Sequence, residues 1–154
     1  MENELIQRYE AGATALRDAL AGLSREELLA FPIPGTWSIQ QIAIHLADTE
    51  TVFAARMKWV IAEDEPPLQA MDENRWTAGL AYEQQSAADA AELVRLTRKQ
   101  MVSVLRALPE AALQRAGTHT VAGRKTLKEL VEKAVDHQDH HLKFLLEKRK
   151  KLGK

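Results

Sequence analysis

The chain has 154 residues, of which 45% are hydrophobic and 28% are charged, so it is long enough to bury the core of one globular domain. Its 21 basic and 22 acidic residues leave a net charge of −1 with neutral histidines, and this excludes an overall field that would attract nucleic acid or an anionic membrane. The chain has no cysteine, which excludes disulfides and thiolate metal sites, so a bound metal would need His, Asp or Glu ligands.

The composition predicts an all-α fold in a single domain over residues 1–154. Ala, Leu, Glu, Lys and Arg dominate, whereas there are only seven glycines and five prolines. No apolar run is long enough to cross a bilayer, and the first residues lack a basic segment followed by an apolar one. We therefore expect a cytoplasmic protein with neither membrane nor nucleic-acid partners.

The first third of the chain contains two helix signals. Apolar spacing predicts one continuous helix over residues 2–20. Ser24 and Glu27 have the spacing of a capping box and open a short helix, which ends before the prolines from Pro32 onward.

A second long helix is predicted from Ser38 to about Ile61. Ser38 and Gln41 form another capping box, and Trp37 stands where it can pack on the first turn. His45 lies on the edge of the buried stripe, and Arg56 follows it along the same line. Taken alone, His45 is more simply explained as a structural residue.

The middle of the chain contains a long connector, a third helix and a loop. Residues 63–85 are irregular and too many for a tight turn between antiparallel neighbours, so they should cross the bundle. Asp72, Arg75 and Trp76 in this connector could cover a site, or Trp76 could close the end of the bundle. The third helix should run over residues 86–108, and its predicted buried face consists of Leu93, Leu96, Gln100, Val104 and Leu108.

The loop over residues 116–125 is bounded by glycines and is predicted to be a small extended excursion. His119 is interpreted as a surface residue of this loop. Thr126 and Glu129 form a further capping box, which opens a helix that continues to the basic run at residues 148–151.

This last helix contains three of the five histidines. His137 and His141 are four residues apart and therefore lie one above the other on the helix. His137 lies at the edge of the apolar stripe, and His141 lies within it. His140 falls outside that stripe and should face water. The pair could bind one divalent ion, but such spacing also occurs by chance in helices whose histidines have no chemical role.

Four main helices predict a four-helix bundle with a long crossover connection. In such a bundle His45 can face His137 and His141, and three neutral imidazoles leave open positions on a divalent ion, as a catalytic site requires. Asp48 and Asp136 are the nearest carboxylates in sequence that could polarise these ligands.

Residues 34–48, which run from Pro34-Gly-Thr-Trp-Ser to His45-Leu-Ala-Asp48, resemble the helix-2 signature of the DinB-like superfamily and of its YfiT-like branch. The segment from His137 to His141 is similar to the second signature of that family, and residues 63–76 also resemble the YfiT-like branch. The resemblance implies a bundle with a nickel or zinc ion on His45, His137 and His141, often in a homodimer. Some relatives carry a further histidine where this chain has Phe144.

Relatives in this family include transferases of low-molecular-weight thiols, thiol-dependent isomerases and metal-dependent hydrolases. The resemblance therefore implies a small-molecule thiol and an electrophile as substrates. With no cysteine in the chain, the thiol cannot come from the protein. Two alternatives are hydrolysis by an activated water and a non-catalytic, stress-related dimeric bundle.

Overall fold

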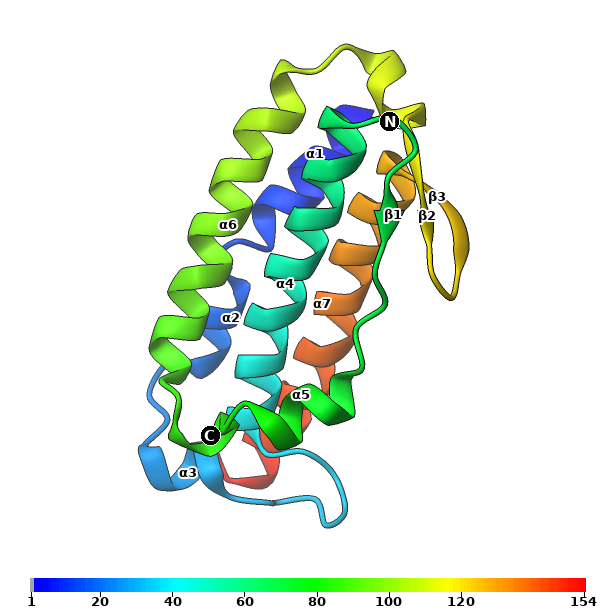
Figure 1. Ribbon diagram of the computed structural model, residues 1–154. Helices are drawn as coiled ribbons and strands as arrows, with labels where there is room; N and C mark the ends of the chain where they lie inside the picture. The colour runs from blue at the N-terminus through cyan, green and yellow to red at the C-terminus, as the bar shows by residue number, and fades with distance from the viewer. Residues whose placement is uncertain (1) are drawn as a thin grey trace.

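The computed structural model describes residues 2–154 and consists of a bundle of long helices (Figure 1). One column of the bundle contains two consecutive shorter helices, and each of the other three columns is one long helix. The predicted four-helix bundle is confirmed, and its columns are α1 (Glu2–Ala11) with α2 (Ala15–Leu20), α4 (Ile39–Ala62), α6 (Ala87–Ala107) and α7 (Leu127–Lys151).

Short elements join the long helices. A three-stranded sheet has the order β1-β2-β3, in which β1 pairs parallel to β2 and β2 pairs antiparallel to β3. The predicted excursion over residues 116–125 is therefore a β-hairpin. The short elements are α3 (Arg25–Leu29), β1 (Pro67–Leu68), α5 (Glu73–Gly79), η1 (Tyr82–Gln84), η2 (Glu110–Gln114), β2 (Ala116–His119) and β3 (Gly123–Thr126).

The connector between α4 and α6 crosses the length of the bundle, as predicted. Figure 1 shows α4 and α6 running in the same direction, so the chain must return along the outside of the bundle before α6 begins. It returns through β1 and α5, on the side of the bundle where the hairpin and α7 lie. This path places the connector where it can cover side chains of α4 and α7.

Capping boxes fix where the two helices of the histidine motifs begin. Ser38 Oγ accepts from the Gln41 backbone N–H at 3.1 Å, and Gln41 Oε1 accepts from the Ser38 N–H at 3.0 Å. Thr126 and Glu129 make the same reciprocal pair at the start of α7. Each box satisfies backbone donors that a helix start leaves unpaired, so the start of each helix is well defined.

The prediction of one continuous helix over residues 2–20 is wrong, because the chain breaks between α1 and α2 near Gly12. A Cβ atom on Gly12 would lie 2.0 Å from Arg98 Nη1. The Gly12 carbonyl, released from the helix, accepts a hydrogen bond from Gln138 Nε2 at 2.8 Å. The break therefore admits two long polar side chains from α6 and α7 into the core.

A buried polar layer formed by Tyr9, Glu50 and Arg98 crosses the core. Arg98 Nε and Nη2 donate to Glu50 Oε2 at 3.0 and 2.9 Å, and Tyr9 Oη donates to Glu50 Oε1 at 2.5 Å. The remaining Arg98 donors reach the carbonyls of Tyr9 at 3.0 Å and Ala134 at 3.1 Å. Burial and the neighbouring Glu50 carboxylate raise the pKa of the Tyr9 phenol. Aliphatic clusters pack on both sides of this layer.

The predicted buried face of the third helix is confirmed only in part, because Val104 and Leu108 pack half-buried against the core whereas its other members are exposed. Leu93 and Leu96 are 44% and 49% exposed, whereas α6 buries alanines, Val94 and Met101 around Arg98. The small residues allow close contact with α4, and Arg98 lies on the same helix face as Val94, Met101 and Leu105, where hydrophobic periodicity predicts an apolar residue.

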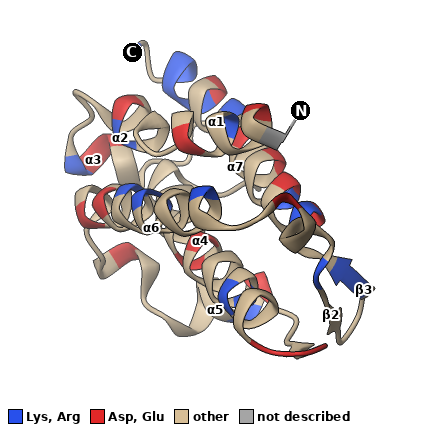
Figure 2. Cartoon of the chain, turned by 90° about the horizontal axis from the view of Figure 1, so that it is seen from above, with Lys and Arg blue, Asp and Glu red and all other residues tan. Residues whose placement is uncertain are grey.

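Charged residues of both signs are distributed over the outside of the helices (Figure 2). This distribution agrees with the near-zero net charge. Among residues 2–154, no helix combines the length and apolar character needed to cross a bilayer.

Candidate metal centre

His45 of α4 lies beside His137 and His141 of α7. One ring nitrogen from each residue can be chosen so that all three lie within 4.8 Å of one another. The Nε2 atoms of His45 and His137 are 3.2 Å apart. Two imidazole nitrogens at about 2.0–2.1 Å from a tetrahedral zinc ion would be about 3.4 Å apart, so the pair has the separation that a shared ion needs.

The surroundings keep all three imidazoles neutral near pH 7. Burial, helped by the other histidines, lowers the pKa of His45 to about 4, of His137 to about 3 and of His141 to about 4. Neutral imidazole is the form that binds metal, so the triad is in its ligand state without having to release protons at neutral pH. The donor set thus fits a divalent ion of intermediate softness such as zinc or nickel.

Aromatic rings hold the triad in place. The Trp37 ring is stacked on His141 with centroids 6.0 Å apart and meets His45 edge-on at 4.8 Å. Phe53 packs edge-on against His137 at 5.7 Å. These contacts restrict ring rotation and keep the nitrogen atoms directed toward one another.

The prediction that Asp48 or Asp136 polarises a ligand is wrong. Asp48 accepts a hydrogen bond from Tyr82 Oη at 2.6 Å, and Asp136 lies 3.6 Å from Arg8 at the surface. The carboxylate nearest to the triad belongs instead to Glu73 at the start of α5, whose Oε2 is 3.7 Å from His45 Nε2. Sequence spacing could not identify Glu73, because the crossover connector brings it to α4.

Two cavities meet the triad from different sides. His45 and His137 line a cavity of about 330 Å³ together with Arg56, Met71 and Glu73. His141 lines a second cavity of about 320 Å³, whose walls include Ile33, Trp37, Ile42 and Phe144. Each is large enough for a small organic molecule.

The other residues considered in the sequence take different places. His140 is exposed, as predicted, and packs edge-on against Phe144. His119 is not a surface loop residue, because it lies at the end of β2, is half-buried and lines the cavity of His45 and His137. The connector reaches that cavity through Ala70, Met71 and Glu73, whereas Asp72 caps α5 by accepting from the Arg75 N–H at 3.1 Å. Trp76 is not among the lining residues.

Comparison with known proteins gives the same architecture. A family profile described as the DinB superfamily matches residues 8–145. A protein of Oceanobacillus iheyensis named "Putative metal-dependent hydrolase" is 24% identical over 144 residues, covering 91% of this chain and 80% of its own. A protein of the same name from Bacillus licheniformis is 28% identical over 140 residues, covering 90% and 79%.

YfiT of Bacillus subtilis, also named a "Putative metal-dependent hydrolase", is 22% identical over 153 residues, which cover 99% of this chain and 86% of YfiT. The solved YfiT structure superposes with a TM-score of 0.91 over 99% of this chain and 87% of that one. That structure is described as "a probable metal-dependent hydrolase with an unusual four-helix bundle topology". The helix order and the crossover connector are thus those of a known fold.

Proposed function

Since the chain belongs to the DinB superfamily, we propose that it is a metal-dependent enzyme whose His45, His137 and His141 hold one divalent ion, nickel or zinc. Three neutral imidazoles converge beside a cavity, and the candidate group contains no fourth side chain among residues 2–154. A site with three protein ligands and a position left for substrate is typical of catalytic rather than structural zinc.

We further propose that the reaction joins a small-molecule thiol to an electrophile. The observation that carries this proposal is the pair of cavities, because a group transfer needs two substrates at one centre whereas hydrolysis needs one and water. The protein has no cysteine, so the thiol must be a substrate. A bound divalent ion supplies the lowered pKa that makes a coordinated thiol reactive at neutral pH.

Residues of the chain would provide positioning and proton transfer. The Glu73 carboxylate, 3.7 Å from His45 Nε2, is placed to accept the thiol proton. The sulfur then attacks the electrophilic carbon, a C–S bond forms, and the bond to the leaving group breaks with departure of its electron pair. Trp37 and Phe53 pack against the imidazoles and limit the access of water.

Hydrolysis is the second candidate, and the position of Glu73 is the observation that favours it. The same carboxylate could accept a proton from a water molecule at the triad. Relatives that match most of this chain are named as metal-dependent hydrolases.

The test begins with elemental analysis of the purified protein and of a His137→Ala variant. We expect about one nickel or zinc ion per chain in the wild type and none in the variant. A low-molecular-weight thiol should then react with a haloarene or an epoxide faster in the presence of metal-loaded protein, and a chelator should abolish the gain. Metal-loaded protein that cleaves esters or amides without thiol would support hydrolysis, and loaded protein inactive in every assay would support a non-catalytic bundle.

A further inference from the structure

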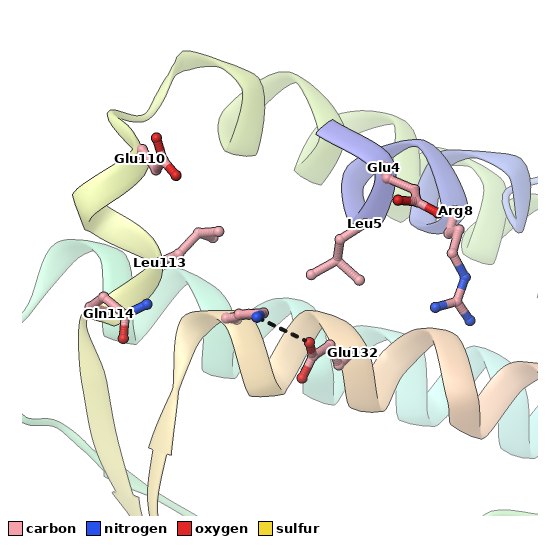
Figure 3. Close-up of a pocket in the computed structure, with 8 residues that line it drawn as sticks. Glu4, Leu5, Arg8, Glu110, Leu113, Gln114 and Glu132 are labelled. Atoms are coloured by element: carbon pink, nitrogen blue, oxygen red, sulfur yellow. Dashed lines mark ion pairs between the residues drawn. The ribbon is translucent and has the colours of Figure 1, made fainter. Parts of the chain in front are cut away.

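Most charged side chains that line cavities of this protein are exposed and need no ligand. The cavity at the end of the bundle where α1 begins is lined by Glu4, Arg8, Glu110 and Glu132, which face solvent, and Glu132 pairs with Lys128 at 3.7 Å (Figure 3). Water satisfies such groups. Arg56 of α4 differs from them, because it is only 8% exposed.

Arg56 has no counter-ion among the residues that the structure describes. Its Nη2 donates to the Gln69 carbonyl oxygen at 2.5 Å, but its buried Nε has no hydrogen-bond partner among residues 2–154. No carboxylate of the described residues forms an ion pair with it. Burial lowers the pKa of the Arg56 guanidinium. A buried cation without an anion is unfavourable, so the site is complete only when something else supplies the negative charge.

His119 provides a second donor on the same side of the cavity. Its Nδ1 accepts the backbone N–H groups of Val121 at 3.2 Å and Ala122 at 3.0 Å. The proton of the neutral ring is therefore on Nε2, which is left free to donate. Burial lowers the pKa of His119, and the nearby charges of Arg56 and Lys125 lower it further. Both Arg56 and His119 line the cavity that His45 and His137 also line.

The two ends of this cavity differ in charge, and the Phe53 ring lies between them. The centroid of that ring is 5.8 Å from Arg56 Cζ and 5.7 Å from the centroid of the His137 ring. The end at His45 also holds the Glu73 carboxylate, which would repel an anion, whereas the far end has the Arg56 cation. Apolar walls from Val52, Phe53 and Met71 lie between them. An elongated molecule with one anionic end would bind in a single orientation.

We propose that Arg56 and His119 form a subsite for a carboxylate group of the substrate, whose other end reaches the histidine triad. The proposal rests on the proposed function only in assigning the reaction to the triad. On the side of this cavity, one guanidinium and one neutral imidazole offer a single positive charge, which matches a carboxylate. A phosphate monoester carries about −1.5 to −2 at pH 7 and would leave charge unbalanced in a cavity that already holds Glu73.

The test compares 6-mercaptohexanoate with its primary amide, which has the same length and thiol but no charge. Binding to zinc-loaded protein is measured by calorimetry, and binding to chelator-treated protein by NMR titration. We expect the acid to bind at least about tenfold more tightly than the amide in the wild type, since hydrogen bonds to charged groups contribute that much. The preference should persist without metal, because neither Arg56 nor His119 belongs to the triad.

The variants are Arg56→Met, which should remove the preference, and His119→Ala, which should reduce it. Arg56→Lys should retain part of it, and this variant keeps the test valid if the methionine variant fails to fold. Arg124→Met, which removes an exposed arginine of β3, is the matched control and should leave the preference unchanged. Equal binding of acid and amide by the wild type would overturn the subsite, as would inorganic phosphate competing more strongly than acetate.

Results that contradict the proposed reaction can be told apart from results that contradict the subsite. Arg56-dependent binding of the acid without any thiol-dependent turnover would leave the subsite in place and contradict the assigned reaction. Turnover of both thiols with no dependence on Arg56 would support the reaction and overturn the subsite.

Discussion

Arg98 and Arg56 are both buried arginines on long helices of one bundle, yet among residues 2–154 only Arg98 of these two has a carboxylate partner. Arg98 donates to both sides of the core, to Glu50 and to the carbonyls of Tyr9 and Ala134. Arg56 makes one hydrogen bond, to the Gln69 carbonyl, and its buried Nε has no hydrogen-bond partner among residues 2–154.

Buried polar groups of the first kind stabilise the fold, and we infer that those of the second kind bind a ligand. A buried network that closes on itself has its desolvation offset by its own hydrogen bonds. The cavity side, with Arg56, His119 and the triad, instead contains buried polar atoms without a hydrogen-bond partner among residues 2–154, namely Arg56 Nε and His45 Nδ1. We therefore expect the closed network to govern stability and the open side to govern binding.

The largest effect should come from breaking the closed network. Arg98→Met leaves the Glu50 carboxylate buried without a cation, so we expect the free energy of unfolding to fall by about 3–5 kcal/mol. Arg56→Met removes a cation that has no anion, so the change should be less than about 1 kcal/mol. Urea unfolding of the metal-free proteins measures both values. A larger loss for Arg56 than for Arg98 would show that the contrast is wrong.

Metal addition should act on the open side alone. At a free zinc concentration about 1,000 times the dissociation constant, the wild type should gain about 4 kcal/mol of unfolding free energy, because the ion binds the folded state. His137→Ala should gain nothing, and Arg98→Met, if it folds, should gain as much as the wild type. Thermal unfolding with and without zinc measures the gains. Equal stabilisation of wild type and His137→Ala would place the ion elsewhere.

The sequence predicted those features that depend on local patterns. The capping boxes at Ser38 and Thr126 fixed where two helices begin, and helical spacing directed His45, His137 and His141 toward one another. The bundle and the crossover followed from helix count and connector length. Family resemblance supplied the ligand set, which local pattern alone left uncertain.

Features that depend on tertiary contacts were not predicted from the sequence. Arg98 was not predicted to be buried because a charged side chain is usually exposed, although it lies in line with Val94 and Met101 and its partner Glu50 is buried opposite it. Glu73 and His119 reach the cavity only through the path of the connector and the pairing of the hairpin. For Arg56 the sequence did contain a signal, because Arg56 lies on the same line along its helix as His45.

Acid should destabilise the metal-free protein through the triad. The folded pKa of His45 is about 4, below the value of 6.5 expected in the unfolded chain, so the unfolded chain binds more protons between these values. Stability is therefore complete above pH 6.5 and is lost as pH falls toward 4, by about 3 kcal/mol from His45 alone. Urea unfolding of wild type and His45→Gln at several pH values isolates this share. A difference between them that stays constant from pH 7 to pH 4 would contradict it.

The smallest predicted effect tests whether the closed network extends to the break between α1 and α2. A Cβ on Gly12 would lie 2.0 Å from Arg98 Nη1 and 2.9 Å from Gln138 Oε1, so Gly12→Ala must displace both of these side chains. We expect a loss of about 1–3 kcal/mol of unfolding free energy, the usual cost of overpacking a core. Gly79→Ala is the matched control, because a Cβ there meets nothing within 4 Å. Its stability should change by less than about 1 kcal/mol.

The zinc affinity of Gly12→Ala tests whether the polar layer and the histidine triad are independent of each other. Gly12 contacts the closed network, and none of the residues that a Cβ there would meet is a histidine of the triad. Gly12→Ala should therefore unfold at lower urea concentration yet bind zinc within about threefold of the wild type, a difference of about 0.65 kcal/mol in binding free energy. A variant of unchanged stability that has lost zinc binding would mean that the polar layer positions the metal ligands, and the two regions would then be a single unit.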